Sequence, residues 1–451
     1  MSTRVFRGLL ATGAITFALS GVAAAAPLHV AVPHRFAAPP TTDQCETDFG
    51  IACYEPAQFQ QAYGVNAVFK AGNTGQGKTI VIVESFGSPT IQADLQTFDQ
   101  ANNLQDPPSF KIITPAGAPP PYDPTDADMG NWGFETTLDV EYAHTMAPGA
   151  NILLVETPVS ETEGTTGFPE IVQAENYVIN HHLGDVISQS FGATEETFPN
   201  PQSIFALRSA FINAALHGVT VLGASGDGGA TDYQSNLIDF YPFRVNSWPS
   251  SDPLVTSVGG TQLHLDANGN RTAPDNVWND QALFGSPAAG GGGVSAVFSR
   301  PFFQDSVAGV VGHRRGTPDV SLSAAVDGAA VVYIGYTNVP AGIPGPGWYL
   351  VGGTSEASPL FSGIVALADH AAHRDLGVLG PALYQLGDRR HGSGITDITA
   401  GNNTVTFTNS DNVTYTVHGY TAGPGYDLSS GLGTPSAPSF VAQLAGGDHG
   451  H

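Results

Sequence analysis

The feature that most constrains the fold of this chain is the alternation between short apolar runs and segments with helical spacing. The runs TIVIVE (Thr79–Glu84) and NILLV (Asn151–Val155) are rich in Ile, Val and Leu, which is typical of strands buried on both faces of a sheet. Strands that alternate with helices indicate βαβ units and a parallel sheet. We therefore expect an α/β protein with a mainly parallel central sheet flanked by helices.

The expected elements follow one another without an obvious linker. The expected strands are Thr79–Glu84, Phe110–Ile113, Asn151–Val155, Asp185–Ser190, Val219–Gly223, Leu254–Val258 and Ala330–Gly335. The expected helices are Ile91–Asn102, Phe134–Met146, Ile171–His182, Gln202–His217 and one that begins after Ser355. A length of 451 residues suggests about three domains as a prior. The unbroken pattern instead predicts one domain over residues 45–445 with a short tail at 446–451, and the Gly-rich stretch Ala288–Gly293 is expected to be a mobile loop.

The N-terminus has the pattern of an export signal. Arg4 and Arg7 precede a mostly apolar stretch, Leu9–Val22, and the small residues Ala23–Ala26 supply a cleavage site. We predict a signal peptide over residues 1–25 and a soluble, secreted mature protein, because no later run of apolar residues is long enough to span a membrane.

Two cysteines, Cys45 and Cys53, stand close together after a Pro/Ala-rich segment. In an exported protein such a pair indicates a disulfide. The alternative, a metal site, lacks ligands, since no His lies near the pair. The segment 26–44 is expected to be a flexible leader.

The chain is strongly acidic. It has 15 Lys and Arg against 40 Asp and Glu, a formal net charge of −25. Phosphate backbones repel such a chain, which argues against nucleic-acid binding. Charged residues make up 12% and apolar residues 41% of the sequence, which excludes an intrinsically disordered protein. Few basic residues also mean little self-repulsion in acid, although negative charge for solubility explains the composition equally well.

Two motifs carry the chemistry of acyl transfer. In GGTSEASP, a Gly-Gly-Thr turn brings Ser355 to the start of a helix, where free backbone N–H groups can stabilise an oxyanion. Alone, this motif is more typical of a serine that caps a helix. Glu135 and Asp139 are four residues apart, so a helix places both carboxylates on one face. Burial of such a pair makes it share a proton and act as a general acid or base, whereas exposure makes it a solvated acidic face.

Two further motifs place acidic residues in glycine-rich turns. Asp227, in ASGDGGA, follows an expected strand, and ligands of parallel sheets bind beyond the carboxyl ends of strands. The alternative is an Asp that only shapes the turn. Asp397-Ile398 and the later GPGYD, which ends at Asp427, offer an oxygen-rich set of ligands that suits Ca²⁺. Here the alternative is a pair of Asp-capped turns.

Together these motifs resemble the sedolisin family, the serine-carboxyl peptidases, over nearly the whole chain from Tyr54 to Gly433. The resemblance is carried by YEPAQFQQAYGV (Tyr54–Val65), TIVIVESFG (Thr79–Gly87), ETTLD (Glu135–Asp139), SQSFG (Ser188–Gly192), ASGDGG (Ala224–Gly229), WPSSDPLVTSVGGTQL (Trp248–Leu263), GGGGVSAVFSRPFFQ (Gly290–Gln304), TPDVSLSA (Thr317–Ala324), GGTSEASP (Gly352–Pro359) and AGPGYDLSSGLGTP (Ala422–Pro435). It implies a single subtilisin-like domain. Members usually carry a long N-terminal pro-region, and segment 26–44 is too short to be one.

The resemblance also implies roles for single residues. Ser355 is expected to be the nucleophile, Glu135 the general base and acid, and Asp139 its partner. Asp227 is expected to stabilise the oxyanion, and Glu84 to extend the chain of acids. The implied Ca²⁺ ligands, for one structural ion, are Asp397, Asp427 and the carbonyl groups of Ile398, Gly423 and Gly425. Glu356, beside the nucleophile, departs from the expected pattern.

These expectations define a secreted endopeptidase that cleaves polypeptides in acid through an acyl-enzyme. A carboxylate base retains an ionised fraction near about pH 4, where a His base is already charged. An oxyanion partner such as Asp227 must be protonated in order to donate a hydrogen bond. A Ser/His/Asp protease is disfavoured because no HGT-type segment occurs. An inactive, Ca²⁺-stabilised binding protein remains the alternative, and in either case we expect a monomer without nucleic-acid or membrane partners.

Overall fold

In the computed structural model, residues 30–387 and 394–446 are described. The predicted signal peptide (1–25) and all but the first residue of the predicted tail lie outside these ranges. No helix within the described ranges has both the length and the apolar character that a membrane span requires.

The core of the fold is an eight-stranded sheet with the order β11-β10-β8-β6-β3-β5-β4, in which β14 also pairs with β10. Its strands are β3 (Thr79–Ser85), β4 (Phe110–Ile113), β5 (Asn151–Thr157), β6 (Val186–Gln189), β8 (Thr220–Ala224), β10 (Thr256–Gln262), β11 (Asn276–Val277) and β14 (Val320–Ser323). All of its pairs are parallel except β10 with β11. The predicted α/β class with a mainly parallel sheet is therefore confirmed.

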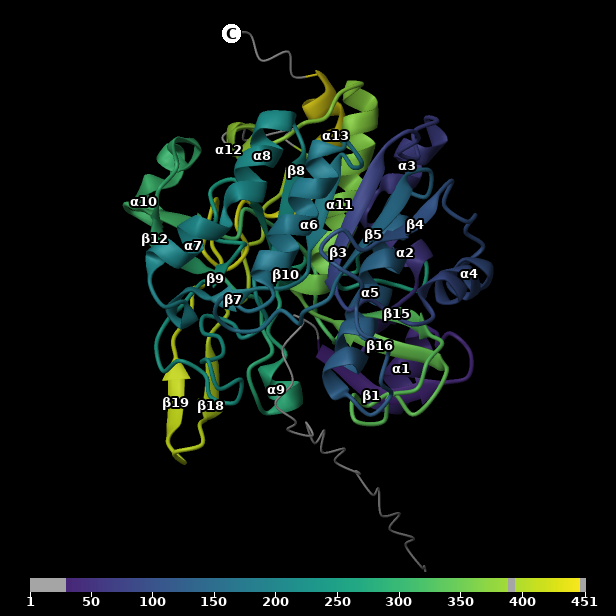
Figure 1. Cartoon of the computed structure of the whole chain (residues 1–451), viewed down its shortest axis with the longest axis horizontal. Helices are drawn as coiled ribbons and strands as arrows, with labels where there is room; N and C mark the ends of the chain where they lie inside the picture. Colours follow the sequence, from purple (N-terminus) through teal and green to yellow (C-terminus); the bar gives the residue numbers. More distant parts are fainter. Residues whose placement is uncertain (1–29, 388–393, 447–451) are drawn as a thin grey trace, which may run out of the picture.

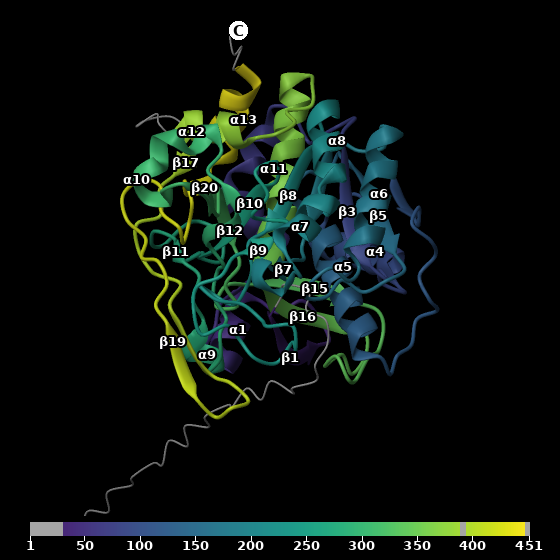
Figure 2. The same cartoon turned by 60° about the vertical axis from the view of Figure 1, so that its left-hand side comes forward.

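Helices cover both faces of this sheet (Figures 1 and 2). The helices are α1 (Thr42–Phe49), α2 (Pro56–Tyr63), α3 (Val65–Lys70), α4 (Ile91–Asn102), α5 (Ala127–Met146), α6 (Phe168–Asn180), α7 (Pro201–Leu207), α8 (Ser209–His217), α9 (Gln281–Phe284), α10 (Ala308–Val311), α11 (Thr354–Ala372), α12 (Gly380–Gly387) and α13 (Ala437–Gly446). In strand β3, Ile80 and Ile82 enter the core beneath α5 and α11, whereas Val81 and Val83 enter the core beneath α6 and α8. Successive side chains of a strand point to opposite faces, so an uninterrupted apolar run fits a strand covered on both sides.

Two predicted helices differ from the structure for local reasons. The helix predicted at Phe134 begins at Ala127, because the Asp126 side chain caps it by accepting from the N–H of Asp128. The helix predicted over Gln202–His217 is divided into α7 and α8 at Arg208. The Arg208 guanidinium forms an ion pair with Asp252, with Nη2 2.8 Å from Oδ1.

A second, four-stranded sheet has the order β1-β16-β15-β2. Its strands are β1 (Val30–Phe36), β2 (Cys53–Tyr54), β15 (Ala329–Ile334) and β16 (Gly347–Gly352). The leader that we expected to be flexible over 26–44 instead supplies β1 and the start of α1 from Val30 onward. The Pro/Ala-rich composition of the segment hid this strand in the sequence, and β1 lies at the edge of its sheet. The predicted disulfide between Cys45 and Cys53 is present.

The remaining strands form short two-stranded pairs at the periphery. They are β7 (Ala193–Thr194) with β9 (Ser247–Trp248), β12 (Gly293–Ser299) with β13 (Arg314–Thr317), β17 (Ile395–Thr396) with β20 (Thr434–Pro435), and β18 (Val405–Thr408) with β19 (Thr414–Val417). The hairpin β18–β19 projects from one edge of the molecule (Figures 1 and 2).

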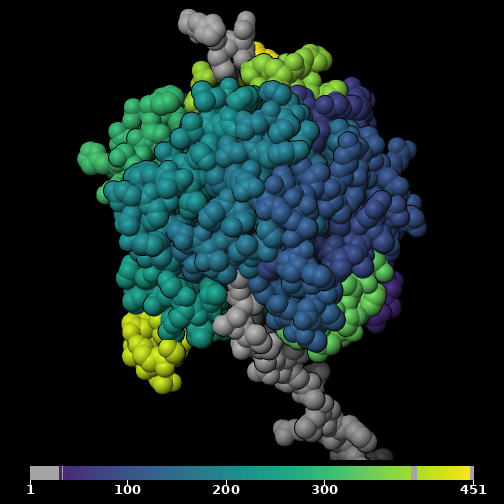
Figure 3. Space-filling view, in the orientation of Figure 1, coloured from purple at the N-terminus to yellow at the C-terminus, as the bar shows by residue number. Residues whose placement is uncertain are grey.

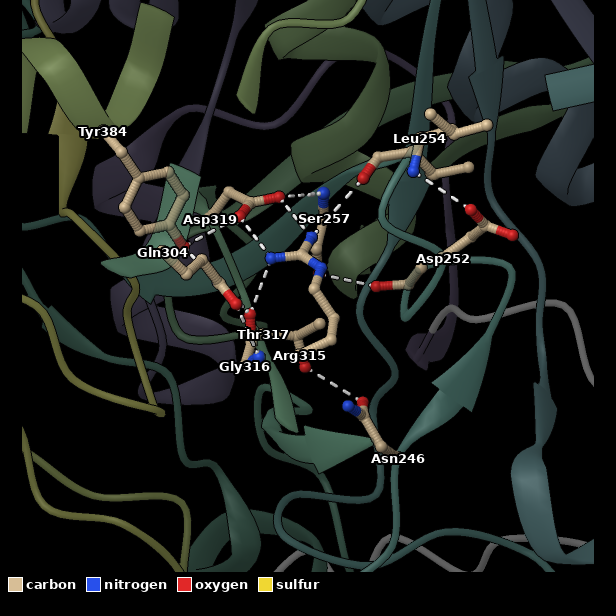
Figure 4. A network of polar contacts seen from close by, with 12 residues as sticks. Asn246, Asp252, Leu254, Ser257, Gln304, Arg315, Gly316, Thr317, Asp319 and Tyr384 are labelled. Atoms are coloured by element: carbon tan, nitrogen blue, oxygen red, sulfur yellow. Dashed lines mark hydrogen bonds and ion pairs between the residues drawn. The ribbon is translucent and has the colours of Figure 1, made fainter. Parts of the chain in front are cut away.

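A buried ion pair joins the second half of the chain to the main sheet (Figure 4). Arg315 is fully buried and donates to both carboxylate oxygens of Asp319, each at 2.6 Å. Asp319 also accepts from the N–H of Ser257 in β10 at 2.8 Å and from the hydroxyl of Tyr384 in α12 at 2.9 Å. The pair therefore ties β10, β13 and α12 together.

We expect Asp319→Ala to lower the free energy of unfolding by about 3–5 kcal/mol, because it leaves the Arg315 charge buried without its partner. Urea denaturation measures the loss. Asp305→Ala is the matched control, since Asp305 pairs with Arg300 at 2.9 Å but is 66% exposed, and its loss is expected to stay below about 1 kcal/mol. Equal losses in the two variants would contradict the role assigned to the buried pair.

Candidate active site

Three polar residues lie where neighbouring parallel strands end. Glu84 is near the end of β3, Ser190 follows β6, and Asp227 follows β8 by three residues. The strands β3, β6 and β8 are adjacent in the sheet, so their carboxyl ends form one edge. Ligand sites of parallel sheets lie at such an edge, and the sequence placed Asp227 there by the same argument.

Helices α5 and α11 bring the other predicted residues to this edge. They pack closely against each other, and the contact needs glycine at Gly363, where a Cβ would lie 2.4 Å from the Cβ of Met146. Gly353 caps α11 with φ of 132°, a conformation that side chains disfavour. Ser355 therefore stands in the first turn of α11, buried, beneath the face of α5 that carries Glu135 and Asp139.

The structure brings Ser355, Glu135 and Asp139 into one network. The Ser355 hydroxyl is hydrogen-bonded to the Glu135 carboxyl, and it also lies 3.4 Å from the carbonyl of Ser190. Asp139 accepts from the Ser190 hydroxyl, with distances of 2.9 and 2.8 Å to its two oxygens. Glu84 is fully buried beside Asp139 and Glu135, and it interacts electrostatically with both.

Burial raises the pKa of each acid in this network. For Glu84 the cause is burial first and the charge of Asp139 second; for Asp139 it is burial first and the charge of Glu135 second. Burial also raises the pKa of Glu135, while the hydrogen bond from Ser355 opposes the shift. The acids therefore hold protons well above the usual range for carboxyl groups. The hydrogen bonds from Ser355 and Ser190 favour any remaining negative charge on Glu135 and Asp139.

Asp227 contacts the start of the same helix, α11. Its Oδ1 accepts from both the N–H and the hydroxyl of Thr354, at 2.8 and 2.7 Å. Its Oδ2 is buried without a hydrogen-bond partner among the described residues. Burial raises the pKa of Asp227 well above the usual range. Because Oδ1 is already an acceptor, a proton on this carboxyl sits on Oδ2 and is free to be donated.

The stretch Ala288–Gly293, which we expected to be mobile, is buried and supports the Asp227 turn. The N–H of Ala289 donates to the carbonyl of Asp227 at 2.9 Å, and the N–H of Gly291 donates to that of Gly226 at 2.7 Å. A Cβ at Gly291 would lie 2.2 Å from the carbonyl oxygen of Ser225. The glycines therefore allow two backbones to approach each other closely, and they do not make the segment flexible.

Two other ionisable residues of α11 and α5, Glu356 and His144, are buried. Glu356 is fully buried, and burial raises the pKa of its carboxyl well above the usual range, so it is neutral in acid. His144, near the end of α5, is buried 3.4 Å from Asp99, and its Nε2 lies 2.9 Å from the carbonyl of Gln105. Burial lowers the pKa of His144 to about 4. The Ser355 network contains no histidine among the contacts that the described residues make.

The residues predicted to bind Ca²⁺ also meet in space. The N–H of Gly425 donates to Asp397 Oδ2 at 2.8 Å, and that of Gly423 donates to Asp427 Oδ2 at 3.0 Å. Burial, with a contribution from the charge of Asp427, raises the pKa of Asp397. Ile398 is buried between these loops. The described chain has no group of three or more His, Cys, Asp or Glu side chains suited to a metal, so an ion here would need backbone carbonyls as well. The donor set, two carboxylates and carbonyls, fits a hard cation.

Two residues of the network lacked an assigned role at the level of sequence. Ser190 positions Asp139, and Thr354 orients Asp227. Both stand inside motifs of the sequence, SQSFG and GGTSEASP, yet their partners are distant in the chain. Only the adjacency of β6, β8 and α11 reveals these contacts.

Comparison with known proteins agrees with the fold. No protein-family model matches the chain. Kumamolisin of Bacillus sp. (strain MN-32) is 33% identical over 390 residues, covering 85% of this chain and 62% of that protein. Sedolisin of Pseudomonas sp. (strain 101) is 30% identical over 400 residues, covering 88% of this chain and 62% of the relative. The chain thus spans about three fifths of the length of these two relatives.

The structural comparison points the same way. The solved structure of Pseudomonas sedolisin (serine-carboxyl proteinase), complexed with two molecules of pseudo-iodotyrostatin, superposes with a TM-score of 0.69 at 27% identity, covering 88% of this chain and 99% of that one. The chain therefore shares the fold of this serine-carboxyl proteinase. The chain is a homologue of the sedolisin family.

Raised carboxyl pKa values make stability depend on pH. A group whose folded pKa lies above its unfolded value binds more protons in the folded state, so stability falls as pH rises from the unfolded pKa through the folded one. We expect the free energy of unfolding to decrease from about pH 4 toward neutrality. Urea denaturation across this range measures the decrease.

Glu356→Gln is the informative variant, because it removes one such group outside the Ser355 network. Its stability is expected to fall less steeply with pH than that of the parent, by up to about 1.4 kcal/mol per pH unit. Stability that rises from acid to neutral pH, or an unchanged slope in Glu356→Gln, would contradict this account.

Proposed function

We propose that the protein is a serine-carboxyl endopeptidase that hydrolyses peptide bonds in acid through an acyl-enzyme on Ser355. The observation that carries the proposal is the hydrogen bond between the Ser355 hydroxyl and the buried carboxyl of Glu135, which in turn interacts with Asp139. A serine needs an adjacent base to act as a nucleophile, and a carboxylate is the base within reach here. The sedolisin homologues support the same assignment.

The proposed reaction begins when the Ser355 hydroxyl attacks the carbonyl carbon of the scissile bond. Glu135 takes the hydroxyl proton, and the carbonyl oxygen becomes an oxyanion. When the tetrahedral intermediate collapses, Glu135 returns the proton to the leaving amine, and the acyl group stays on Ser355. A water molecule then attacks the ester with Glu135 again as the base. Asp139 positions Glu135, and Glu84 extends the group of acids that shares its charge.

Asp227 supplies the hydrogen bond to the oxyanion in this proposal. Thr354 occupies Oδ1, so the proton on Oδ2 can point at the reacting carbonyl. Loss of this proton at higher pH would place a negative charge beside the oxyanion, which is unfavourable. The proposed activity therefore requires a neutral Asp227, which acid favours, together with one negative charge on the Glu135 network, which the hydrogen bonds from Ser355 and Ser190 favour.

We expect the purified protein to digest a denatured protein substrate most rapidly in acid, within a series from about pH 3 to about pH 8, and to be nearly inactive at the upper end. Ser355→Ala is expected to abolish the activity. A maximum at or above about pH 7 would overturn the carboxylate mechanism. Activity that survives in Ser355→Ala would mean that Ser355 is not the nucleophile. The absence of cleavage at any pH would favour a binding protein.

Asp227 variants separate the oxyanion role from a structural one. Asp227→Ala is expected to lower kcat by about a hundredfold or more, as loss of an oxyanion donor does. Asp227→Asn keeps a donor that does not titrate, so it should retain more activity than Asp227→Ala and lose less of it between acid and neutral pH. Identical pH profiles for Asp227→Asn and the parent would count against the role.

We also propose one structural Ca²⁺, held by Asp397, Asp427 and the carbonyls of Ile398, Gly423 and Gly425. The bound ion would neutralise the two carboxylates and brace the loops that carry them. The same proposal covers secretion after removal of residues 1–25, a single peptidase domain over 45–445, a monomeric state and polypeptide substrates.

Removal of Ca²⁺ by a chelator is expected to lower the melting temperature, and excess Ca²⁺ is expected to restore it, because a ligand of the folded state stabilises it by mass action. Differential scanning calorimetry measures both shifts. Asp397→Asn should melt near the temperature of the chelated parent and respond little to Ca²⁺. If neither the chelator nor Ca²⁺ changes the melting temperature of the parent protein, the proposed Ca²⁺ site is wrong.

A further inference from the structure

Glu356 is a buried acid that the proposed reaction does not use, although it directly follows Ser355 in the chain. It lies in the first turn of α11 and is fully buried. Neither of its carboxyl oxygens has a hydrogen-bond partner among the described residues. Such surroundings accept a protonated carboxyl group, whereas ionisation would leave a charge buried without a partner, which is strongly unfavourable.

The groups that face this carboxyl from the neighbouring elements are uncharged. The hydroxyl of Ser323, at the end of β14, and the N–H of Ala330, in β15, both oppose the rise in the pKa of Glu356. The Ser323 hydroxyl also has no hydrogen-bond partner among the described residues, so its approach is longer than a hydrogen bond. Tyr63 of α2 and Tyr142 of α5 interact electrostatically with Glu356, and burial raises the pKa of both phenols, so both remain neutral.

Charged side chains lie behind these two tyrosines. Those that act on one tyrosine or the other are Glu55, Glu141, Arg271 and Asp275. The cation of this set, Arg271, already forms an ion pair with Asp275 at 2.8 Å. No cation of the described residues is among the causes of the pKa shift of Glu356. A negative charge on Glu356 would therefore have no counter-ion where the side chain now lies.

The first turn of α11 is fixed on both sides of Glu356. Before it, the N–H of Gly353 donates to the carbonyl of Ala324 at 2.6 Å. After it, the hydroxyl of Ser358 is hydrogen-bonded to that of Ser188 in β6 at 2.8 Å. The side chain of Glu356 therefore reaches water or a new hydrogen-bond donor only if this turn moves, and the nucleophile is part of the same turn.

We propose that Glu356 is a positioning residue for Ser355, whose neutral side chain keeps the first turn of α11 in place and whose ionisation displaces that turn, and the nucleophile with it. The inference rests on the proposed peptidase function. Burial raises the pKa of Glu356 well above the usual range, so the neutral form is present in acid and is lost as pH rises through this raised value. Glu356 thus acts on the nucleophile, whereas the proposed role of Asp227 concerns the oxyanion.

The test compares the pH profile of kcat in Glu356→Gln with that of the parent, from about pH 4 to about pH 8, on one peptide substrate. Glutamine has nearly the same size and does not titrate, so we expect kcat and KM in acid to stay within about twofold of the parent. Toward neutrality two acids must be neutral in the parent and one in the variant. The fall in kcat of Glu356→Gln is therefore expected to be shallower, by up to about tenfold per pH unit. Circular dichroism at each pH separates a displaced turn from global unfolding.

Asp369→Asn is the matched control. Asp369 is also buried in α11, and burial raises its pKa to about 8. It lies about 20 Å along the helix from Ser355, near the end of α11 at the molecular surface (Figures 1 and 3). Its Oδ1 accepts from the N–H of Leu376 at 3.0 Å, a contact that asparagine can keep. We expect this variant to retain the kcat profile of the parent.

The outcomes separate the inference from the function on which it rests. Equal slopes of kcat against pH in the parent and Glu356→Gln would overturn the inference, and so would the same change of slope in Asp369→Asn. If Glu356→Gln does not fold, Glu356→Met, which is uncharged and of similar length, carries the same expectation for the slope. A parent protein that cleaves no peptide or protein at any pH would instead overturn the proposed function itself.

Discussion

Three carboxylic acids, Glu84, Glu135 and Asp139, are buried where β3, α5 and α11 meet. The rest of the site depends on the free-energy cost of burying them. Desolvation disfavours their charged forms, so protons remain on most of them, and the hydroxyls of Ser355 and Ser190 are placed where charge remains. The same desolvation links the chemistry to stability. An environment that makes a carboxyl group neutral in acid also makes the folded state less favourable as pH rises.

The burial of these acids requires an unusually close contact between two helices. Gly363 allows α11 to approach Met146 of α5, and Gly353 allows the chain to turn from β16 into α11. On the other side of Ser355, buried glycines between Ala288 and Gly293 support the turn of Asp227 through backbone hydrogen bonds. Small residues therefore position the charged ones: a Cβ at Gly363 or Gly291 would lie 2.4 or 2.2 Å from a neighbouring atom, and the φ of Gly353 disfavours a side chain.

The periphery of the molecule is built by elements outside the main sheet. The second sheet places β1 antiparallel to β16, with its N-terminal end beside the start of α11. The hairpin β18–β19 adds an aromatic wall by packing Phe407 against Phe240. Neither element belongs to the eight-stranded sheet that carries Glu84, Ser190 and Asp227. The candidate site residues and these peripheral elements thus belong to different layers of the fold.

The sequence by itself determined the class of fold, because apolar runs such as Thr79–Glu84 must be covered on both faces. It also indicated Ser355, Glu135, Asp139 and Asp227 as candidate site residues, through the resemblance of their motifs to the sedolisin family. Helical spacing and the ends of strands, which are local properties, left a structural alternative open for each of them. Tertiary structure alone decided that Ser190 holds Asp139, that Ala288–Gly293 is buried, and that β1 forms a strand instead of a flexible leader. Each of these depends on contacts between segments far apart in the chain, which local composition does not encode.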